Sequence, residues 1–210
     1  MIALIDYGAG NLTSVRKGFS AAGADLFSPQ DPSHLATASG IVVPGVGHFA
    51  ATSALDGAWV EAIRHWTTRG TPLLGICLGM QWLYEGSEEA PGVAGLGSIA
   101  GVCARLPRDG AGGQSIGDAG AGTLKIPHVG WNSLEMPRPS RLLDGVADGT
   151  QVYFTHSYAG PVTPQSVATC THGSTFAATV EDGHVFGVQF HPEKSSDAGI
   201  RILRNFAGLT

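Results

Sequence analysis

Apolar runs and helical patterns alternate along the first part of the chain. Three runs of consecutive apolar residues are typical of strands covered on both faces, and they lie at 2–5, 41–43 and 72–76. The segments with helical periodicity follow these runs, at about 12–22, 52–69 and 78–85. Asn11 is a suitable N-cap for the first helix, and Gly23 and Gly70 are suitable C′ residues. Three βα units in succession predict a parallel sheet with functional residues at the carboxyl ends of its strands.

The second half of the chain has the turn signals and short apolar runs of additional strands. Residues 151–158 form one predicted strand, and two more, near 175–181 and 184–190, flank the turn-forming pair Asp182-Gly183. A closing helix begins near Asp197. The sequence therefore predicts an α/β fold with a mostly parallel open sheet flanked by helices and an additional antiparallel portion in the C-terminal half.

The composition is that of a globular protein. With 210 residues, 43% of them hydrophobic and 14% charged, the chain can bury a substantial core, and we expect one domain over 1–210. Within it, residues 107–122 are mainly Gly, Ala, Ser and Asp, which favours a flexible surface loop without chemistry. The net charge of −5 and the lack of a basic run argue against nucleic acid as a partner.

The N-terminus and the cysteines indicate a compartment. Residues 1–6 lack the basic start and long apolar centre of a signal peptide, and no apolar run is long enough to cross a bilayer. The cysteines are odd in number and form no Cys-x-x-Cys, which argues against a disulfide framework or a structural zinc site. We expect a cytoplasmic protein that does not enter a membrane, with Cys103 and Cys170 in its core.

The segment Leu73–Gln81 joins a strand pattern to a helical pattern through a cysteine between two glycines. In a nucleophile elbow the turn is so tight that the neighbours of the central residue must lack side chains, a demand that Gly75 and Gly79 meet. The turn would hold the Cys77 sulfur at the N-terminus of the following helix, where the amides and the dipole favour thiolate. The alternative is that Cys77 is a small buried hydrophobe.

A base for this nucleophile is predicted just after the second hairpin strand. In Gln189–Glu193, Pro192 keeps His191 extended, and residues i and i+2 of an extended chain point the same way. His191 and Glu193 should lie side by side, so that the carboxylate sets the imidazole tautomer and stabilises its cation. A surface His–Glu pair is the alternative, but together with the elbow the pattern predicts a Cys77–His191–Glu193 triad. Ordinary structural or surface roles are expected for His34, His48, His65, His172 and His184.

Backbone donors for an oxyanion are predicted at two places. The amide of Leu78 follows the nucleophile directly, and the loop Pro44–Gly47 offers a second amide, from Val46 or Gly47, unless it is only a tight βα turn. The two glycines of Gly8-Ala9-Gly10 match the start of a G-x-G-x-x-G dinucleotide-binding motif, but the third glycine is missing. A loop that contacts a ligand or a partner is therefore favoured there.

Several motifs carry a resemblance to a known family. The elbow segment Gly75–Gln81 and the distant segment Phe190–Lys194 resemble the motifs of class I, triad-type glutamine amidotransferases. Within them the pattern is most similar to the glutaminase subunits of imidazole glycerol phosphate synthase, through Asp6–Leu12, Pro44–Phe49 and Lys125–Asn132. The resemblance covers nearly the whole chain, and its main departure is the Gly/Ala-rich insertion.

The resemblance implies a thioester mechanism. Cys77 would attack the side-chain amide of L-glutamine, His191 would protonate the leaving ammonia and then activate water, and Glu193 would orient His191. No cofactor and no metal are implied. The implied glutamine pocket consists of Gly47, Gln81, Glu89, His156, Ser157 and Tyr158, beside the oxyanion candidates Val46 and Leu78.

The resemblance also implies a heterodimer. Ammonia would pass to a separate (βα)8-barrel cyclase subunit, which would make imidazole glycerol phosphate and aminoimidazole carboxamide ribonucleotide in histidine biosynthesis. The implied interface residues are Asn11, Lys17, Lys125, His128, Trp131 and Asn132. A core position is the alternative for Trp131. We further hypothesise that the glycines around Val46 let its amide turn away from the oxyanion until partner docking and nucleotide binding turn it inward.

Other readings remain open on the sequence alone. A cysteine peptidase-like or chaperone-like hydrolase can share this kind of sheet and elbow, although Gln81 and the late His191-x-Glu193 favour an amidotransferase. A pure docking module is disfavoured because all three triad positions are filled. Among amidotransferases, a pyridoxal phosphate synthase glutaminase or an anthranilate-type subunit is the main rival, against which Met80 and residues 125–132 argue.

Overall fold

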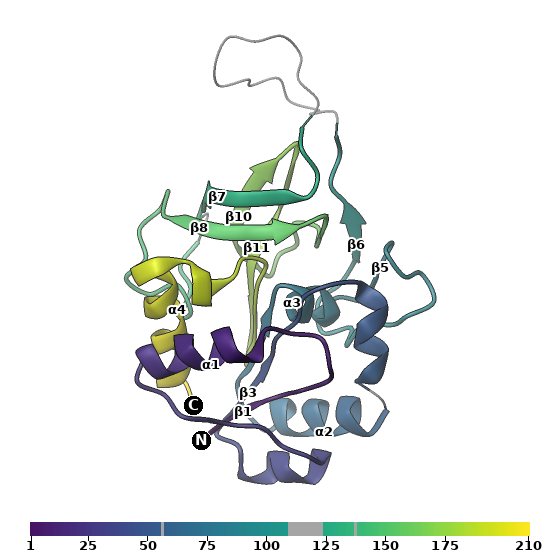
Figure 1. Ribbon diagram of the computed structural model, residues 1–210, viewed down its shortest axis with the longest axis vertical. Helices are drawn as coiled ribbons and strands as arrows, with labels where there is room; N and C mark the ends of the chain where they lie inside the picture. The colour runs from purple at the N-terminus through teal and green to yellow at the C-terminus, as the bar shows by residue number, and fades with distance from the viewer. Residues whose placement is uncertain (56, 109–123, 137) are drawn as a thin grey trace.

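The part of the chain that the structure describes, residues 1–55, 57–108, 124–136 and 138–210, is built around a seven-stranded sheet (Figure 1). The structure is a computed structural model. In chain order the strands of this sheet are β1 (Ile2–Leu4), β2 (Leu26–Phe27), β3 (Gly40–Val43), β4 (Leu73–Ile76), β10 (Ser166–His172), β11 (Ser174–Asp182) and β12 (Val185–Val188). Their spatial order is β10-β11-β12-β4-β3-β1-β2. The five strands from β12 to β2 pair in parallel, whereas β10, β11 and β12 pair antiparallel, so the predicted fold class is confirmed.

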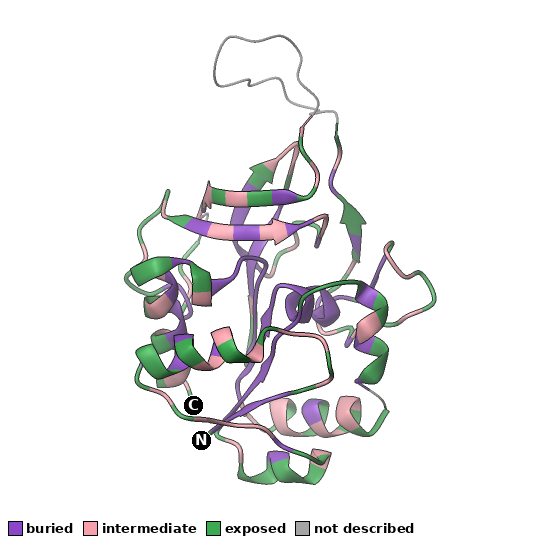
Figure 2. Cartoon of the chain, viewed as in Figure 1, coloured by how far each residue is buried: buried purple, intermediate pink, exposed green. Residues whose placement is uncertain are grey.

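Helices cover both faces of this sheet (Figure 1). The α-helices of the described residues are α1 (Leu12–Ala21), α2 (Gly57–Thr68), α3 (Leu78–Leu83) and α4 (Ser196–Gly208). Helices α1 and α4 pack on one face, where Phe19 and Phe206 share a core cluster with Val188 of β12. Helices α2 and α3 cover the other face, where Ile63 and Trp82 belong to a second cluster. Figure 2 shows the result, with buried strands and exposed outer helix surfaces. None of the described helices has the length and apolar character needed to span a bilayer.

Two small sheets lie beside the carboxyl ends of the central strands. Strands β7 (His128–Ser133) and β8 (Gln151–His156) form an antiparallel pair, with His128 opposite His156. Strand β6 (Val102–Arg105) pairs in parallel with β5 (Gly86–Ser87) and antiparallel with β9 (Tyr158–Ala159). The predicted strand at 151–158 is therefore divided between two sheets, which brings residues 155–158 to the edge where β4 ends. Of the predicted flexible loop at 107–122, residues 109–122 lie outside the described residues.

Some predicted boundaries are wrong. The helix expected at 52–69 is two elements, the 3₁₀ helix η2 (Phe49–Ala54) and α2, because hydroxyls in η2 bond back to carbonyls three residues earlier, as Thr52 does to Phe49 at 2.8 Å. The third helix ends at Leu83. Strand β2 was not predicted, since two half-buried residues give no periodic signal. The hairpin turn occupies residues 183–184, one position later than predicted, since Asp182 pairs with Val185. Another 3₁₀ helix, η1 (Pro32–Thr37), precedes β3.

Candidate active site

Cys77 occupies a sharp turn between β4 and α3. Its φ of 54° and ψ of −106° are unusual for a residue with a side chain, as a nucleophile elbow requires. Side chains at the flanking glycines would not fit, because a Cβ at Gly75 would lie 2.5 Å from the carbonyl oxygen of Gly79, and one at Gly79 would lie 1.8 Å from that of Val43. The Cys77 N–H donates to the carbonyl of Val188 at 2.8 Å, which fixes the elbow to the end of β12. The predicted elbow geometry is confirmed.

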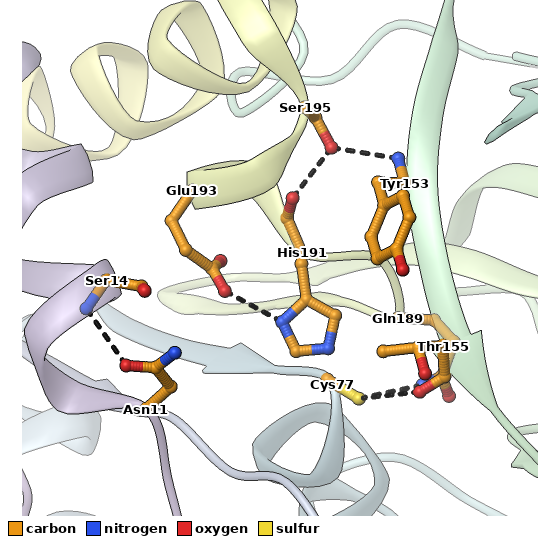
Figure 3. Close-up of polar contacts among 9 residues, drawn as sticks. All are labelled: Asn11, Ser14, Cys77, Tyr153, Thr155, Gln189, His191, Glu193 and Ser195. Carbon is orange, nitrogen blue, oxygen red and sulfur yellow. Dashed lines mark hydrogen bonds and ion pairs between the residues drawn. The ribbon is translucent and has the colours of Figure 1, made fainter. Parts of the chain in front are cut away.

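His191 and Glu193 lie beside the elbow, as Figure 3 shows. The Nδ1 of His191 is 2.8 Å from Oε1 of Glu193, and both side chains are 2% exposed. The predicted contact is present, but the predicted reason for it is wrong. Only His191 is extended, with φ −101° and ψ 97°, whereas Glu193 lies in a 3₁₀ turn, η3 (Pro192–Lys194), that brings its carboxylate back to the imidazole.

The backbone of His191 is held to β8 by a residue that the sequence did not single out. Ser195 Oγ donates to the His191 carbonyl at 2.7 Å and accepts from the Tyr153 N–H at 3.0 Å (Figure 3). The His191 N–H donates to the Tyr153 carbonyl at 2.9 Å. Ser195 is 1% exposed, and its position just before α4 at an N-cap was the available signal. The imidazole is therefore anchored from both its side chain and its main chain.

The groups around His191 favour its cationic form. Burial by itself lowers the pKa of the His191 imidazole, but its interactions with Cys77 and Glu193 outweigh burial and raise that pKa from 6.5 to about 10. Among the described residues, His191 Nε2 has no hydrogen-bond partner, and Figure 3 shows this edge of the ring on the Cys77 side. A thiolate facing an imidazolium whose other nitrogen contacts a carboxylate can act first as nucleophile and acid, then as leaving group and base.

Behind the sulfur lies a network of neutral amides and imidazoles. Gln189 Nε2 is 3.7 Å from Cys77 Sγ, and Gln189 Oε1 accepts from Gln81 Nε2 at 3.2 Å. Gln81 Nε2 also donates to the Tyr158 carbonyl at 2.8 Å. The same carbonyl lies 2.9 Å from Nδ1 of His156. Gln189 was not predicted, yet the i, i+2 rule used to predict the His191–Glu193 contact also places Gln189 and His191 on one side of an extended segment.

The network continues through a second imidazole to β7. His128 Nδ1 is 3.1 Å from His156 Nε2, and Asn132 Nδ2 is 3.3 Å from His128 Nε2. Burial lowers the pKa of His128 to about 4 and that of His156 to about 3, so both rings are neutral at physiological pH. The His128 ring stacks at 4.8 Å on Phe154 and at 4.2 Å on His172.

A cavity of about 240 Å³ opens in front of the sulfur. Its lining contains Cys77, the oxyanion candidates Val46 and Leu78, and the six pocket residues implied by the resemblance: Gly47, Gln81, Glu89, His156, Ser157 and Tyr158. Sequence reasoning missed two further lining residues, Pro127 and Thr155. The Thr155 carbonyl is 4.0 Å from the sulfur, and its place beside His156 was the only signal for it.

The expected oxyanion donor is engaged by a carbonyl. The Leu78 N–H donates to the Gly45 carbonyl at 3.4 Å, so the Gly45–Val46 peptide presents its oxygen to this donor. Because a trans peptide directs its N–H opposite to its carbonyl, the Val46 amide points away from Leu78. Gly47, with φ of 101°, follows this peptide. The structure thus has the resting orientation that we hypothesised from the sequence.

The implied interface residues differ in how far they are exposed. Asn11, Lys17, Lys125 and Trp131 are exposed, and Asn132 is half-buried. Trp131 is 50% exposed, which excludes the core alternative for this side chain. His128 is only 4% exposed, because its ring is covered by aromatic neighbours, so in this chain it differs from the exposed candidates. Val129, which is 56% exposed, lies two residues before Trp131 on β7, so both side chains point to the same side of the strand.

Comparisons with known proteins find relatives over nearly the whole chain. Residues 3–208 match the family model described as glutamine amidotransferase class-I. The imidazole glycerol phosphate synthase subunit HisH of Moorella thermoacetica is 44% identical over 212 residues, covering 99% of this chain and 94% of that protein. The HisH subunit of Methanosarcina acetivorans is 40% identical over 211 residues, covering 99% of this chain and 98% of that protein.

Solved structures extend the comparison to the fold. A crystal structure of a glutamine amidotransferase superimposes with a TM-score of 0.71 at 18% identity, covering 100% of this chain and 98% of the other. PurLQS from Thermotoga maritima gives a TM-score of 0.70 at 16% identity, covering 99% of this chain and 97% of the other. At these identities the likeness shows the fold alone.

Proposed function

Because the chain belongs to the class-I glutamine amidotransferases, and among them to the HisH subunits of imidazole glycerol phosphate synthase, we propose that it hydrolyses L-glutamine through Cys77 in histidine biosynthesis. The observation that carries this proposal is that Cys77 lines the cavity while the buried His191–Glu193 pair lies beside it. We also infer that residues 1–210 act as one glutaminase domain.

Substrate binding follows from the lining of the cavity. Among the described residues that line it, Glu89 is the one carboxylate, and it suits the α-ammonium group of an amino acid. Glu89 is fixed in place because its Oε2 accepts from the Phe49 N–H at 2.7 Å. With the ammonium group at Glu89, the side-chain amide extends toward Cys77, which lines the same cavity.

The chemistry then proceeds in two halves. The Cys77 thiolate adds to the amide carbon, and the resulting tetrahedral oxyanion collapses to a thioester as the C–N bond breaks and His191 protonates the departing nitrogen. His191, now neutral, takes a proton from water, which attacks the thioester. The C–S bond breaks, glutamate leaves and the electron pair returns to the sulfur as thiolate. Glu193 stabilises the cationic form of His191 throughout.

The oxyanion step requires a change at Gly45. The Leu78 N–H donates to the Gly45 carbonyl, so in this state it is engaged elsewhere. Rotation of the Gly45–Val46 peptide would free the Leu78 N–H and turn the Val46 N–H inward, supplying two donors. Losing one such donor typically costs about 10²- to 10³-fold in rate, so the resting orientation keeps glutamine hydrolysis slow. We propose that docking of a partner, together with its nucleotide ligand, drives this rotation.

The partner that we propose is a separate (βα)8-barrel cyclase subunit, which would use the ammonia to make imidazole glycerol phosphate and aminoimidazole carboxamide ribonucleotide. The HisH names of the relatives support assembly as a subunit. Exposed Val129 and Trp131 form an apolar pair on β7, and exposed Lys17 and Lys125 suit acidic groups on a partner. We place this assembly in the cytoplasm, which the three free cysteines support.

The test is glutamate release from glutamine. The chain is assayed alone, with the cyclase subunit, and with the cyclase subunit plus its nucleotide ligand. Strong stimulation by the loaded partner, abolished by Cys77→Ala, is the expected result. Equal rates for the isolated chain and the loaded complex would contradict the rotation of the peptide. Rapid release without a partner would point to another pathway, and cleavage of peptides in place of glutamine would point to a peptidase-like hydrolase.

A further inference from the structure

A buried amide outside the triad contacts the nucleophile. Gln189 is fully buried, lies two residues before His191 and places its Nε2 3.7 Å from Cys77 Sγ (Figure 3). A side-chain amide carries no charge and does not titrate, so its N–H can stabilise an anionic sulfur at any pH at which the protein is folded. Hydrogen bonds to an ionised acceptor are about twice as strong as those between neutral groups.

Hydrogen bonds away from the sulfur determine whether the oxygen or the NH₂ group of Gln189 faces Cys77. A backbone carbonyl can only accept, so the Tyr158 carbonyl requires Gln81 to present its NH₂ group at 2.8 Å. The same NH₂ group, 3.2 Å away, requires Gln189 to present its oxygen to Gln81. The NH₂ group of Gln189 is left facing Cys77. The orientation of both amides thus follows from one carbonyl whose role as an acceptor is unambiguous.

We propose that Gln189 is a catalytic donor that stabilises the Cys77 thiolate, and that Gln81 is the positioning residue that keeps the donor end of Gln189 toward the sulfur. This inference rests on the proposed nucleophilic role of Cys77. The donor acts at two points in the cycle. It stabilises the free thiolate before attack, and it stabilises the departing sulfur when water breaks the C–S bond of the thioester. In the thioester itself the sulfur is neutral and the hydrogen bond is weak.

Alkylation of Cys77 by iodoacetamide at varied pH tests the donor directly, because this small reagent reports thiolate without requiring glutamine or a partner. Cys103 and Cys170 are fully buried, and Cys77→Ala supplies the background rate. Gln189→Leu keeps the approximate volume and removes the donor. We expect the pH midpoint of alkylation to rise by about one unit, the shift expected for losing a hydrogen bond to a charged group. Gln81→Met should raise it less, since Gln189 can then still donate but is no longer oriented.

A matched control is Thr179→Val. Thr179 is fully buried on β11 and stands opposite Val188, the residue that directly precedes Gln189. The Thr179 hydroxyl has no hydrogen-bond partner among the described residues. This control should leave the pH midpoint unchanged. The thermal unfolding midpoint is measured for each variant, and Gln189→Glu serves if Gln189→Leu does not fold. A carboxylate in place of the amide should shift the profile upward by more than one unit.

The outcomes separate this inference from the proposed function. A midpoint that is unchanged in folded Gln189→Leu or Gln189→Glu would overturn the donor role, whatever the glutaminase assay shows. A shift of equal size in Thr179→Val would also overturn it, because it would reveal a general effect of altering this buried strand. Loss of glutamate release in Cys77→Ala tests the nucleophile itself and is independent of either result.

Discussion

Replacing Glu193 with glutamine separates the charge of the carboxylate from its position. Glu193 Oε1 lies 2.8 Å from His191 Nδ1, with both side chains 2% exposed, so water screens the pair very little. Burial alone lowers the pKa of His191, but Cys77 and Glu193 together raise it to about 10. Glutamine can still accept a hydrogen bond from Nδ1 through its oxygen, but it brings no charge to stabilise the imidazolium.

The size of the effect follows from the strength of the two kinds of hydrogen bond. A hydrogen bond to a charged group contributes about 1.5–3 kcal/mol and a neutral one about 0.5–1.5 kcal/mol, so the His191 cation should lose roughly 1–1.5 kcal/mol, or about one pKa unit. The raised pKa also determines how the stability of the fold depends on pH. Because the pKa of His191 is raised in the folded state from 6.5 to about 10, its protonation stabilises the fold fully below pH 6.5, and this contribution is lost as the pH rises through about 10. In the variant the loss should occur at lower pH.

The assay is glutamate release by the complex with the cyclase subunit and its ligand, with kcat/KM measured across the basic limb of the pH profile. His191 must be protonated to give its proton to the departing nitrogen, so Glu193→Gln should move the basic limb down by about one unit. The control is Glu61→Gln, which removes the same charge from an exposed position on α2. A basic limb that stays in place in Glu193→Gln, or moves equally in Glu61→Gln, would refute the reasoning.

Three more substitutions test the elbow, the docking surface and the support of the base. Gly79→Ala should destabilise the chain by about 1–3 kcal/mol and slow alkylation of Cys77, because its Cβ would lie 1.8 Å from a carbonyl oxygen of β3. Thermal unfolding measures the destabilisation, with Gly57→Ala as the control because its Cβ would meet nothing within 4 Å. Similar unfolding midpoints for the two variants would contradict the prediction. Trp131→Ala should weaken cyclase binding by about 2 kcal/mol, roughly 30-fold, in a calorimetric titration, while the unfolding midpoint of the isolated chain stays unchanged because the side chain is 50% exposed. Ser195→Ala should cost about 1–3 kcal/mol, because it leaves the part-buried Tyr153 N–H without its partner and the His191 carbonyl with only the Lys194 N–H as donor. It should lower kcat more than it raises KM, whereas Ser53→Ala, at an exposed position, should do neither.

The elements that the sequence predicts well are those encoded by local signals. Gly75 and Gly79 indicate the elbow because a tight turn excludes side chains at fixed distances from its centre. Asn11 caps α1 as predicted, accepting from the Ser14 N–H at 3.2 Å (Figure 3). The parallel sheet follows from repeated βα units, and the C-terminal antiparallel strands follow from the hairpin signal at Gly183.

The residues that were missed or misplaced depend on contacts between distant segments. His128 belongs to a strand with exposed neighbours, and aromatic rings from far along the chain, among them those of Phe154 and His172, cover it. Gln189 acquires its role from Gln81 and a carbonyl of β9, none of which is adjacent in sequence. The 3₁₀ turn at Glu193 reaches the same contact as an extended chain would, so the pattern predicted the right neighbour by the wrong route.

The pairing of β4 with β12 has a consequence for engineering this protein. Ile76 stands opposite Val188 in this parallel pair, so the sulfur and the imidazole emerge from neighbouring strands whose register fixes their separation. A slip of one residue would move the base by about 3.3 Å and turn it to the other face. The long connection between the two strands includes β8, whose Tyr153 holds the backbone of His191. Two fragments divided within this connection are therefore a practical design for a split reporter, in which chemical activity returns only when β4 and β12 pair again.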